Sequence, residues 1–524
     1  MSGVTAKRRE WLFLLAAALV VCTGILPSAS AVTGRAYDTT AISVDTSDFA
    51  VAISVGGRHL TTLGGPVAPF TYWTTSNVEH RATRVLSKKQ AGPTTTYTVA
   101  TSEQGRNMSV SIRQLTTGVQ ITYAVDAPAT ITAVGIAMTA SPTAHYLGSG
   151  QRVSSVDMRR TVQPLKASSD CQSSSPSPFF VSTSGLGAWA STWAVGRMAF
   201  PGATDDPNAC SLEAPVCPVG PPANAVRFCF KTATATMTVA RGSLEQLVIA
   251  HAKATGLPRA PWLPQLALIK WRDRIAAPAA LFDDIKQLRA RHIPIGWVLL
   301  DNPWEQGASH SACYGSLTFD TTAYPDPKAM IARIHAEGVR FMLWISPQIN
   351  RTPPCPAPNY PDGWLSGDDQ TFVWDLTLPA ARDSYISHLK ALVDLGVDGF
   401  KGDRGDEVNL EPDRLAGGPG TVFQNLYPLL YDRATEAGLE ARHGKNFATM
   451  SRSVVPGSSS VLPGFVGPDA EQSYNGLEAE IRAGQTAGIA GAPVWGSDVG
   501  GYAGGGPLTA GVFVRWAQFE ALAP

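Results

Sequence analysis

The sequence has few charged residues, and they form no block of one sign. Charged side chains make up 16% of the 524 residues, with 42 Lys and Arg balancing 42 Asp and Glu. A nucleic-acid-binding protein carries a basic patch as its electrostatic footprint, so no nucleic-acid partner is expected. Because 44% of the residues are hydrophobic, the chain also lacks the composition of a disordered protein. The chain is long enough for more than one domain.

Long apolar runs are absent beyond the first 31 residues. Basic residues at 7–9 precede a mostly apolar stretch from Trp11 to Leu26, and small residues at 29–31 offer a cleavage site. A membrane anchor is the alternative, but a spanning helix needs about 20 apolar residues, and this run contains Gly24 and is followed by Pro27. We expect a signal peptide over residues 1–31, secretion to the medium or cell envelope, and no stable membrane association after cleavage.

Cysteine pairs at metal-ligand spacing are absent too. Seven Cys are present, Cys22 would leave with the signal, and no C-x-x-C pair occurs, so a zinc site is not predicted. Six cysteines in an exported chain predict disulfides. We expect Cys313 and Cys355 to pair, with Cα atoms within about 7 Å, because both lie in loops that follow neighbouring strands. Three pairings are open for the other four, which are Cys171, Cys210, Cys217 and Cys229.

The N-terminal half has the composition of a β-rich domain. It is rich in Thr, Ser, Val and Gly, and it contains short alternating runs at 50–55, 95–99, 120–123 and 234–239. Short β-rich runs broken by Gly and Pro are typical of an antiparallel sandwich. We therefore assign residues 32–257 to an N-terminal β-sandwich domain.

From residue 258 onward the pattern changes to strands that alternate with helices. Strands are predicted at 266–271, 295–300, 339–345, 397–401, 447–451, 464–467 and 493–496, and helices at 279–291, 327–337 and 380–395. Repeated strand–helix units with buried strands predict a parallel sheet. No Gly-rich phosphate loop follows the first strand, so a nucleotide-binding fold is disfavoured. We predict a (β/α)8 barrel over residues 258–524, incomplete because the chain stops where an eighth strand should begin.

Polar side chains stand at the carboxyl ends of five of these predicted strands. They are Asp301, Asp403, Arg452, Asp469 and Asp498. A single Asp after a strand is often a turn former or a helix N-cap. In a barrel, however, the catalytic groups come from the strand ends on one face. Five such positions together predict one pocket.

Two carboxylates in one pocket are the requirement of a glycosidase, in which one attacks as an anion and the other donates a proton. Lys401 and Arg404 flank Asp403 and favour its charged form, which suits a nucleophile. Asp469 follows a less polar Phe-Val-Gly-Pro stretch, a setting that raises a carboxyl pKa and suits a proton donor.

Several motifs then resemble those of glycoside hydrolase family 31. Residues 401–407, KGDRGDE, look like the family's K-x-D-F-G-E nucleophile motif, and residues 451–453, SRS, look like its Arg-Ser. Residues 467–469, GPD, are similar to the stretch that carries the acid/base, and residues 491–502, GAPVWGSDVGGY, strongly resemble a segment ending in D-I-G-G-F. Residues 178–187 resemble the stretch that precedes the barrel. The order and spacing of these motifs make the resemblance specific.

The resemblance implies a set of roles. Asp403 would be the nucleophile and Asp469 the acid/base, while Asp301, within LDNPW, and Arg452 would bind the sugar. Substrate-binding roles are also expected for Lys401 and Asp498. Aromatic residues near strand ends, Trp271, Trp304, Trp344 and Trp495, are candidates for sugar stacking, with core packing as the alternative. We select Trp344 and Trp495 as substrate-binding residues.

The sequence departs from the family pattern at three places. Arg404 replaces the usual aromatic and Asp406 the usual Glu, and Pro468 and Ala470 flank Asp469. The extra cation suits a non-glucose or anionic substrate, or it forms a salt bridge with Asp406 or Glu407, which we favour. Residues 515–524 look like the helix that precedes the last barrel strand. We expect a fragment or truncated product, with activity belonging to the intact parent.

We therefore predict a secreted retaining α-glycosidase acting on an α-linked oligosaccharide or glycoside through a covalent glycosyl-aspartate. The alternatives are an α-transglycosylase and a non-catalytic carbohydrate-binding protein on a degenerate barrel. No cofactor and no metal are expected. The sugar, the linkage and the oligomeric state are not determined by the sequence.

Overall fold

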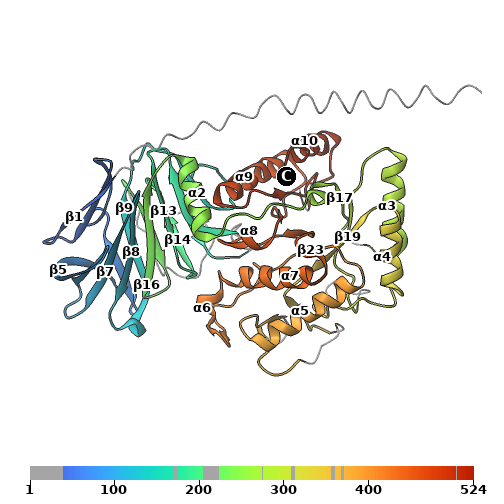
Figure 1. Ribbon diagram of the computed structural model, residues 1–524, viewed down its shortest axis with the longest axis horizontal. Helices are drawn as coiled ribbons and strands as arrows, with labels where there is room; N and C mark the ends of the chain where they lie inside the picture. The colour runs from blue at the N-terminus through green and yellow to red at the C-terminus, as the bar shows by residue number, and fades with distance from the viewer. Residues whose placement is uncertain are drawn as a thin grey trace, which may run out of the picture.

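The computed structural model describes residues 39–168, 175–203, 223–273, 275, 277–307, 313–353, 355, 360–367, 371–502, 504 and 506–523. The predicted signal peptide and Cys22, Cys171, Cys210 and Cys217 lie outside these residues. The described chain consists of a β-rich N-terminal domain beside a domain of mixed helices and strands (Figure 1). None of its helices has the length and apolar character needed to cross a membrane.

The described part of the N-terminal domain contains 16 antiparallel strands. They are β1 Thr40–Asp45, β2 Ala50–Val55, β3 Arg58–Gly64, β4 Phe70–Thr74, β5 Glu79–Ala91, β6 Thr94–Thr101, β7 Asn107–Leu115, β8 Gly118–Val125, β9 Ile131–Thr139, β10 Tyr146–Gly150, β11 Val162–Leu165, β12 Pro176–Ser182, β13 Leu186–Ala190, β14 Gly196–Ala199, β15 Ala225–Phe230 and β16 Thr234–Arg241. Their order is β1-β2-β3-β9-β4-β5-β6-β7-β8-β16-β13-β12-β10, with β11-β14-β15 joined to β9. The four predicted alternating runs lie in β2, β6, β8 and β16.

The strands fold over one core, as a sandwich does. Phe70 of β4 contacts Tyr123 of β8 at 5.7 Å between ring centroids, although the two strands are far apart in the strand order. The inward positions of β2 alternate with partly exposed ones, because successive side chains of a strand point to opposite faces. The predicted antiparallel sandwich is confirmed.

In the C-terminal domain, the described residues form seven parallel strands in the order β17-β18-β19-β23-β26-β27-β28. They are β17 Ile269–Lys270, β18 Trp297–Leu300, β19 Arg340–Ile345, β23 Gly399–Gly402, β26 Ala448–Ser451, β27 Phe465–Val466 and β28 Trp495–Gly496. All seven overlap predicted strands. Among the described residues no eighth strand joins β28 to β17, so the sheet is that of an incomplete barrel.

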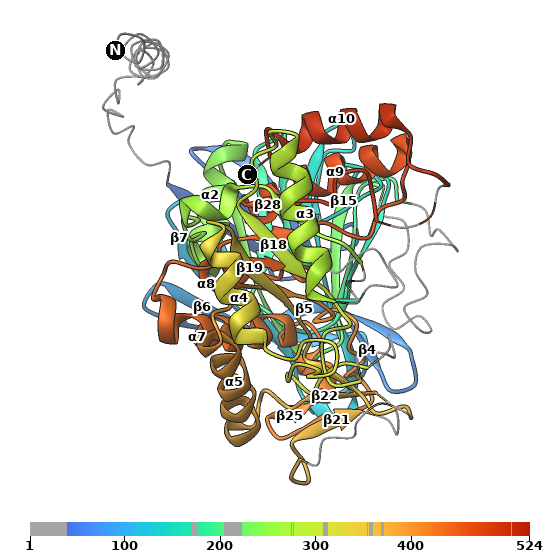
Figure 2. The same cartoon turned by 90° about the vertical axis from the view of Figure 1, so that its right-hand side faces the viewer.

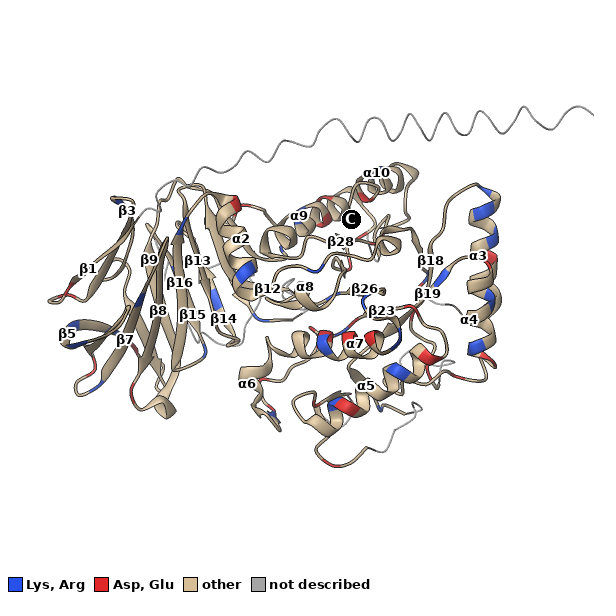
Figure 3. Cartoon of the chain, viewed as in Figure 1, with Lys and Arg blue, Asp and Glu red and all other residues tan. Residues whose placement is uncertain are grey.

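Helices cover the outer face of this sheet (Figure 2). They are α3 Pro278–Ala290, α4 Pro327–Ala336, α5 Pro379–Asp394, α7 Tyr427–His443, α9 Tyr474–Ala490 and α10 Ala510–Glu520. Asp326 caps α4 by accepting from the backbone N–H of Ala329 at 2.8 Å, and α9 is followed directly by Gly491, whose φ is +111°. Acidic and basic positions mark the outer helix α3 (Figure 3). The predicted helices at 279–291, 327–337 and 380–395 are confirmed as α3, α4 and α5.

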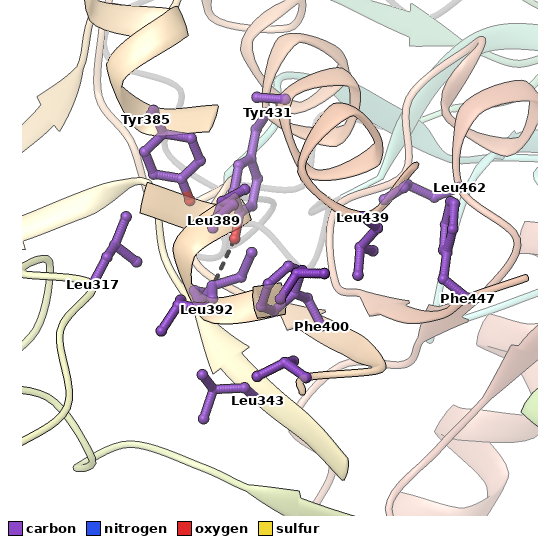
Figure 4. Close-up of a cluster of buried hydrophobic side chains, with 14 of the residues drawn as sticks. Leu317, Leu343, Tyr385, Leu389, Leu392, Phe400, Tyr431, Leu439, Phe447 and Leu462 are labelled. Atoms are coloured by element: carbon purple, nitrogen blue, oxygen red, sulfur yellow. Dashed lines mark hydrogen bonds between the residues drawn. The ribbon is translucent and has the colours of Figure 1, made fainter. Parts of the chain in front are cut away.

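Alternation along the strands sorts their side chains between the two faces of the sheet. Phe341, Leu343 and Ile345 of β19 belong to the large core shared with the helices, whereas Met342 belongs to a separate cluster with Trp297. Figure 4 shows the helix side of this arrangement, where Leu343 and Phe400 of the strands lie near Leu389 and Leu392 of α5, and Leu439 and Tyr431 of α7 complete the layer. The opposite parity, which includes residues 342 and 344, faces the barrel interior.

Two loops on the carboxyl side of the sheet are joined covalently. Cys313, after β18, and Cys355, after β19, form the predicted disulfide with a Cα–Cα distance of 5.1 Å. The second loop also contains a small antiparallel sheet of β20 Gln348–Asn350, β21 Leu365–Gly367 and β22 Thr371–Trp374. Cys229 is disulfide-bonded as well, and the remaining cysteines of that half lie outside the described residues.

Direct contacts hold the sandwich against the barrel. The indole N–H of Trp495 donates to Gln151 Oε1 at 3.0 Å, and the backbone N–H of Val454, in the loop after β26, donates to Ser175 Oγ at 2.9 Å. The helix α2, Leu244–Thr255, links the two domains in the chain and packs on both β12 and α9. The N-terminal domain therefore supports loops at the carboxyl end of the sheet.

Candidate active site

The five polar residues predicted to share a pocket do lie at one edge of the sheet. They follow β18, β23, β26, β27 and β28, whose carboxyl ends meet there because the strands are parallel. Direct contacts connect Asp403 with Arg452 and Arg452 with Asp469. These contacts join three of the five side chains into one cluster.

Asp403 is held as a carboxylate by several donors. Its Oδ2 accepts from the indole N–H of Trp344 at 2.8 Å, and its Oδ1 accepts from the backbone N–H of Arg404 at 2.8 Å and lies 3.1 Å from Arg452 Nη1. Burial alone would raise the pKa of Asp403, but Arg452, Lys401 and the Trp344 hydrogen bond outweigh it and lower that pKa to about 2. Asp403 is therefore ionised at neutral pH, as a nucleophile must be.

Asp469 has a different environment. Its side chain is 52% exposed, and its Oδ2 lies 3.6 Å from the same Nη1 of Arg452. Burial of part of the carboxyl raises the pKa of Asp469, Arg452 opposes this, and the negative charge of Asp403 reinforces it. A carboxyl with a raised pKa that remains open to solvent suits a proton donor.

The shared nitrogen atom limits the distance between these two carboxylates. Because Asp403 Oδ1 and Asp469 Oδ2 both lie close to Arg452 Nη1, the two oxygen atoms are at most about 7 Å apart. Retaining glycosidases place their carboxyls roughly 5–5.5 Å apart and inverting ones roughly 6.5–9.5 Å. The geometry excludes a separation near 9 Å for this pair of atoms.

A second polar group lies on the other side of Asp403. Lys401 Nζ is 2.8 Å from Asp301 Oδ2, and the indole N–H of Trp271 donates to the same oxygen. The Lys401 ammonium also lies over the Trp271 ring, 5.1 Å from its centroid. Burial raises the pKa of Asp301, while Lys401 opposes that shift. The predicted residues Asp301 and Lys401 thus pair with each other, and Trp271 joins them.

Asp498 adds a further acid beside this group. Burial raises the pKa of Asp498 to about 6, against the opposing charge of Lys401. Four residues farther along, Tyr502 packs on Trp271 with ring centroids 5.6 Å apart, and its hydroxyl donates to Asp273 Oδ1 at 3.2 Å. Trp271 and Tyr502 thus place aromatic surface beside these polar groups. Tyr502 was not selected from the sequence, although it stands in the strongly matching 491–502 segment.

The two tryptophans predicted to bind substrate have different positions. Trp344 is on the interior side of β19 and contacts Asp403, although it is only 1% exposed. Trp495 is corrected: it is 3% exposed, belongs to the helix-side core, and packs over Gly484 of α9, where a Cβ would come within 2.8 Å of the ring. Its side chain lies on the opposite face of the sheet from Asp403 and Asp498. Trp495 therefore packs in the core and does not bind substrate as predicted. Trp304 is likewise fully buried.

Arg404 has the predicted salt bridge. Its Nη1 is 2.8 Å from Glu407 Oε2, and its guanidinium lies over the ring of Tyr314 at 4.8 Å. The backbone of Arg404 has a φ of +59°, which a bulky residue rarely adopts. Tyr314, which follows the disulfide-bonded Cys313, is a contact that no sequence pattern signalled. Among the described residues, no group of three or more His, Cys, Asp or Glu is placed to hold a metal ion.

Comparisons with known proteins identify the family of the barrel domain. The family model for the glycosyl hydrolases family 31 TIM-barrel domain matches residues 261–524. An α-xylosidase from Emericella nidulans is 29% identical over 246 residues, which cover 44% of this chain and 31% of that protein. An α-xylosidase from Saccharolobus solfataricus is 27% identical over 296 residues, covering 54% and 39%.

A solved structure of a family 31 sulfoquinovosidase from E. rectale, in complex with an aza-sugar inhibitor, has a TM-score of 0.71 with this chain. The two are 16% identical, and the match covers 92% of this chain and 78% of that chain, so it supports the fold. The matched part spans about a third of the length of the two α-xylosidases.

Proposed function

The chain belongs to glycoside hydrolase family 31, and from this we propose that it is the catalytic part of a retaining α-glycosidase. The observation that supports this proposal most directly is the pair of carboxylates on one guanidinium nitrogen. Arg452 Nη1 is 3.1 Å from Asp403 and 3.6 Å from Asp469, and the two acids have pKa values shifted in opposite directions. Opposite shifts in one pocket are the arrangement that separates a nucleophile from a proton donor.

In the proposed first step, an Asp403 oxygen attacks the anomeric carbon of an α-glycoside. The bond from that carbon to the leaving oxygen breaks, and Asp469 gives its proton to the leaving oxygen. In the second step, Asp469 takes a proton from water, and the water oxygen attacks the anomeric carbon of the glycosyl ester. Asp403 leaves as a carboxylate, and the sugar is released with its original configuration.

The other residues of the pocket would bind the sugar. Asp301 and Asp498 can accept hydrogen bonds from sugar hydroxyls, and Lys401 can donate to them. Trp271 and Tyr502 offer apolar ring surface for a sugar face. Relatives named as α-xylosidases, an isomaltosyltransferase and a sulfoquinovosidase support an α-linked glycoside as substrate and keep transglycosylation as the second candidate. The presence of both carboxylates speaks against a purely carbohydrate-binding role.

We also propose that the protein is exported. The basic and apolar pattern of residues 1–31 carries this proposal, and the Cys313–Cys355 disulfide supports an oxidising compartment. Fractionation of producing cells, with N-terminal sequencing of the mature protein, tests it. A protein retained in the cytoplasm with residues 1–31 intact would contradict it.

The test of function uses aryl α-glycosides of several sugars with the full protein that carries this chain. Asp403→Ala should abolish turnover, and azide should restore part of it with a product of inverted configuration, because the small anion replaces the lost nucleophile. A fluorosugar inactivator should label the peptide that contains Asp403. Glu436→Gln, at a residue of α7 that pairs with Arg259 and Lys445, is the control and should behave as the wild type. Labelling of Asp406 or Glu407, with Asp403→Ala still active, would show that the nucleophile is another residue.

The acid/base is tested separately by leaving-group dependence. Asp469→Ala should slow substrates with poor leaving groups far more than those with good ones, because only the former need a proton. In the wild type, kcat/KM should fall at high pH as Asp469 loses its proton, and Asp469→Ala should lack that alkaline decline. Equal slowing of all substrates would contradict the assignment.

A further inference from the structure

The guanidinium of Arg452 has a carboxylate at each of its three nitrogen atoms. Nη1 contacts Asp403 and Asp469, Nε is 3.3 Å from Asp406 Oδ1, and Nη2 donates to Glu407 Oε1. The Arg452 side chain is only 10% exposed. Because a guanidinium is planar and rigid, the contacts at Nε and Nη2 determine where Nη1 lies.

Glu407 is itself held at several points. Its Oε2 is 2.8 Å from Arg404 Nη1, and its backbone carbonyl accepts from Gln348 Nε2 at 3.0 Å. Arg404 in turn lies over the ring of Tyr314. The contacts therefore form a series from Arg404 to Glu407 to Arg452, and from there to both catalytic carboxylates.

Arg404 and Glu407 belong together in the sequence as well. Arg404 takes the place where the resembling motif has an aromatic residue, and Glu407 supplies the negative charge that balances it. The same Glu407 side chain uses its other oxygen for Arg452. If Arg404 served only to recognise an anionic substrate, the contact of Glu407 with Arg452 would not be needed.

We propose that Glu407 is a positioning residue, anchored by Arg404, that acts through Arg452 to hold Nη1 between Asp403 and Asp469. This role rests on the proposed glycosidase function. Glu407 touches no reacting atom in the proposed mechanism. Its contribution is to keep one cation in contact with the nucleophile and the proton donor at the same time.

The sign of the pH effect follows from the groups around this series. They are Lys401, Asp403, Arg404 and Asp406 after or in β23, Arg452 after β26, Asp469 after β27 and Tyr314 after β18. If Arg452 moves away from Asp403, the pKa of Asp403 rises from about 2, because Arg452 is the strongest of the groups that lower it. Removing the charge of Glu407 would by itself lower that pKa. Moving Arg452 away and removing the charge of Glu407 therefore shift the pKa of Asp403 in opposite directions.

Glu407→Asp separates these two effects, because Asp keeps the negative charge but has a shorter side chain that no longer holds Arg452 in place. We expect kcat to fall by about tenfold with little change in KM, and the acidic limb of kcat/KM to move to higher pH. Arg404→Met, at a side chain 33% exposed, should have a smaller effect in the same direction. The double variant should resemble Glu407→Asp alone, because the residues act in series.

Glu436→Gln is the control for general effects of the changes, and a thermal unfolding midpoint near that of the wild type shows that each variant is folded. An unshifted acidic limb in both Glu407→Asp and Arg404→Met, or additive losses in the double variant, would overturn the positioning role. So would an Arg404→Met enzyme in which only KM for anionic aryl glycosides rises. A wild type inactive on every aryl α-glycoside would instead overturn the proposed function, and this role with it.

Discussion

Glu480 offers the sharpest test of the electrostatics of this fold. It lies on α9, is 1% exposed, and its Oε2 has no hydrogen-bond partner among the described residues. Its charged neighbours, Asp498, Glu520 and Asp469, are all acidic. Burial, with a smaller contribution from these neighbours, raises the pKa of Glu480 from 4.5 to about 9. We predict that Glu480→Gln stabilises the protein at neutral pH.

The size of this stabilisation follows from the free energy needed to keep the Glu480 carboxyl protonated in the folded protein. One pKa unit corresponds to about 1.4 kcal/mol, so holding a proton at neutral pH, roughly 2.5 units above the unfolded pKa, costs about 3 kcal/mol. Because the folded pKa of Glu480 is the higher one, its contribution to stability is complete below pH 4.5 and is lost as pH rises toward about 9. Gln has no such cost.

Thermal unfolding of both proteins across this pH range is the assay. The unfolding midpoints of the two proteins should coincide near pH 4.5, and that of the variant should be higher by roughly 6–12 °C at neutral pH, at about 2–4 °C per kcal/mol for a domain of this size. Glu436→Gln, which loses a carboxylate paired with Lys445, is the control and should show no such gain. A difference that does not change with pH, or a variant less stable at neutral pH, would refute the reasoning.

Two further predictions concern the backbone that carries the pocket. Replacing both Cys313 and Cys355 with Ser removes a link across 42 residues and should cost about 3–4 kcal/mol, seen as a lower denaturant midpoint, whereas an unchanged midpoint would show that the link adds no stability. Gly420→Ala would place a Cβ 1.5 Å from the carbonyl oxygen of Leu410 and should lower the unfolding temperature sharply. Gly488→Ala, with no atom within 4 Å of the new carbon, is its control and should be neutral or stabilising by about 0.5–1 kcal/mol; equal losses in both would contradict the steric explanation.

The barrel strands were predictable because each is a short apolar run between polar turns. Their lengths were less so: the predicted strand at 266–271 is reduced to β17, Ile269–Lys270, and residues 263–266 form a 3-10 turn. Among the described residues β17 pairs only with β18, and Leu266 and Leu268 are 46% and 44% exposed. Hydrophobicity alone does not distinguish an edge strand from a central one.

The positions of the acidic residues were predictable from the strand ends. To predict which face of the sheet each aromatic side chain occupies, the alternation along the strand must also be considered. Asp403 has the same parity as Lys401, which faces the interior, whereas Trp495 and Asp498 are three residues apart and so have opposite parity. Period-two alternation was therefore available in the sequence to exclude Trp495 from the pocket. The contact of Tyr314 with Arg404 had no such signal, because it joins the loop after β18 to the loop after β23, which are far apart in the sequence.

In the proposed mechanism, the changing charge of Asp403 lets Asp469 act first as the acid and then as the base. The negative charge of Asp403 contributes to the raised pKa of Asp469, while Arg452 opposes it. In the proposed covalent intermediate, Asp403 is an ester and carries no charge, so its raising effect disappears while Arg452 remains. The pKa of Asp469 must then fall, which favours the carboxylate that takes a proton from water in the second step. Release of Asp403 restores its charge and returns Asp469 to the form that donates a proton.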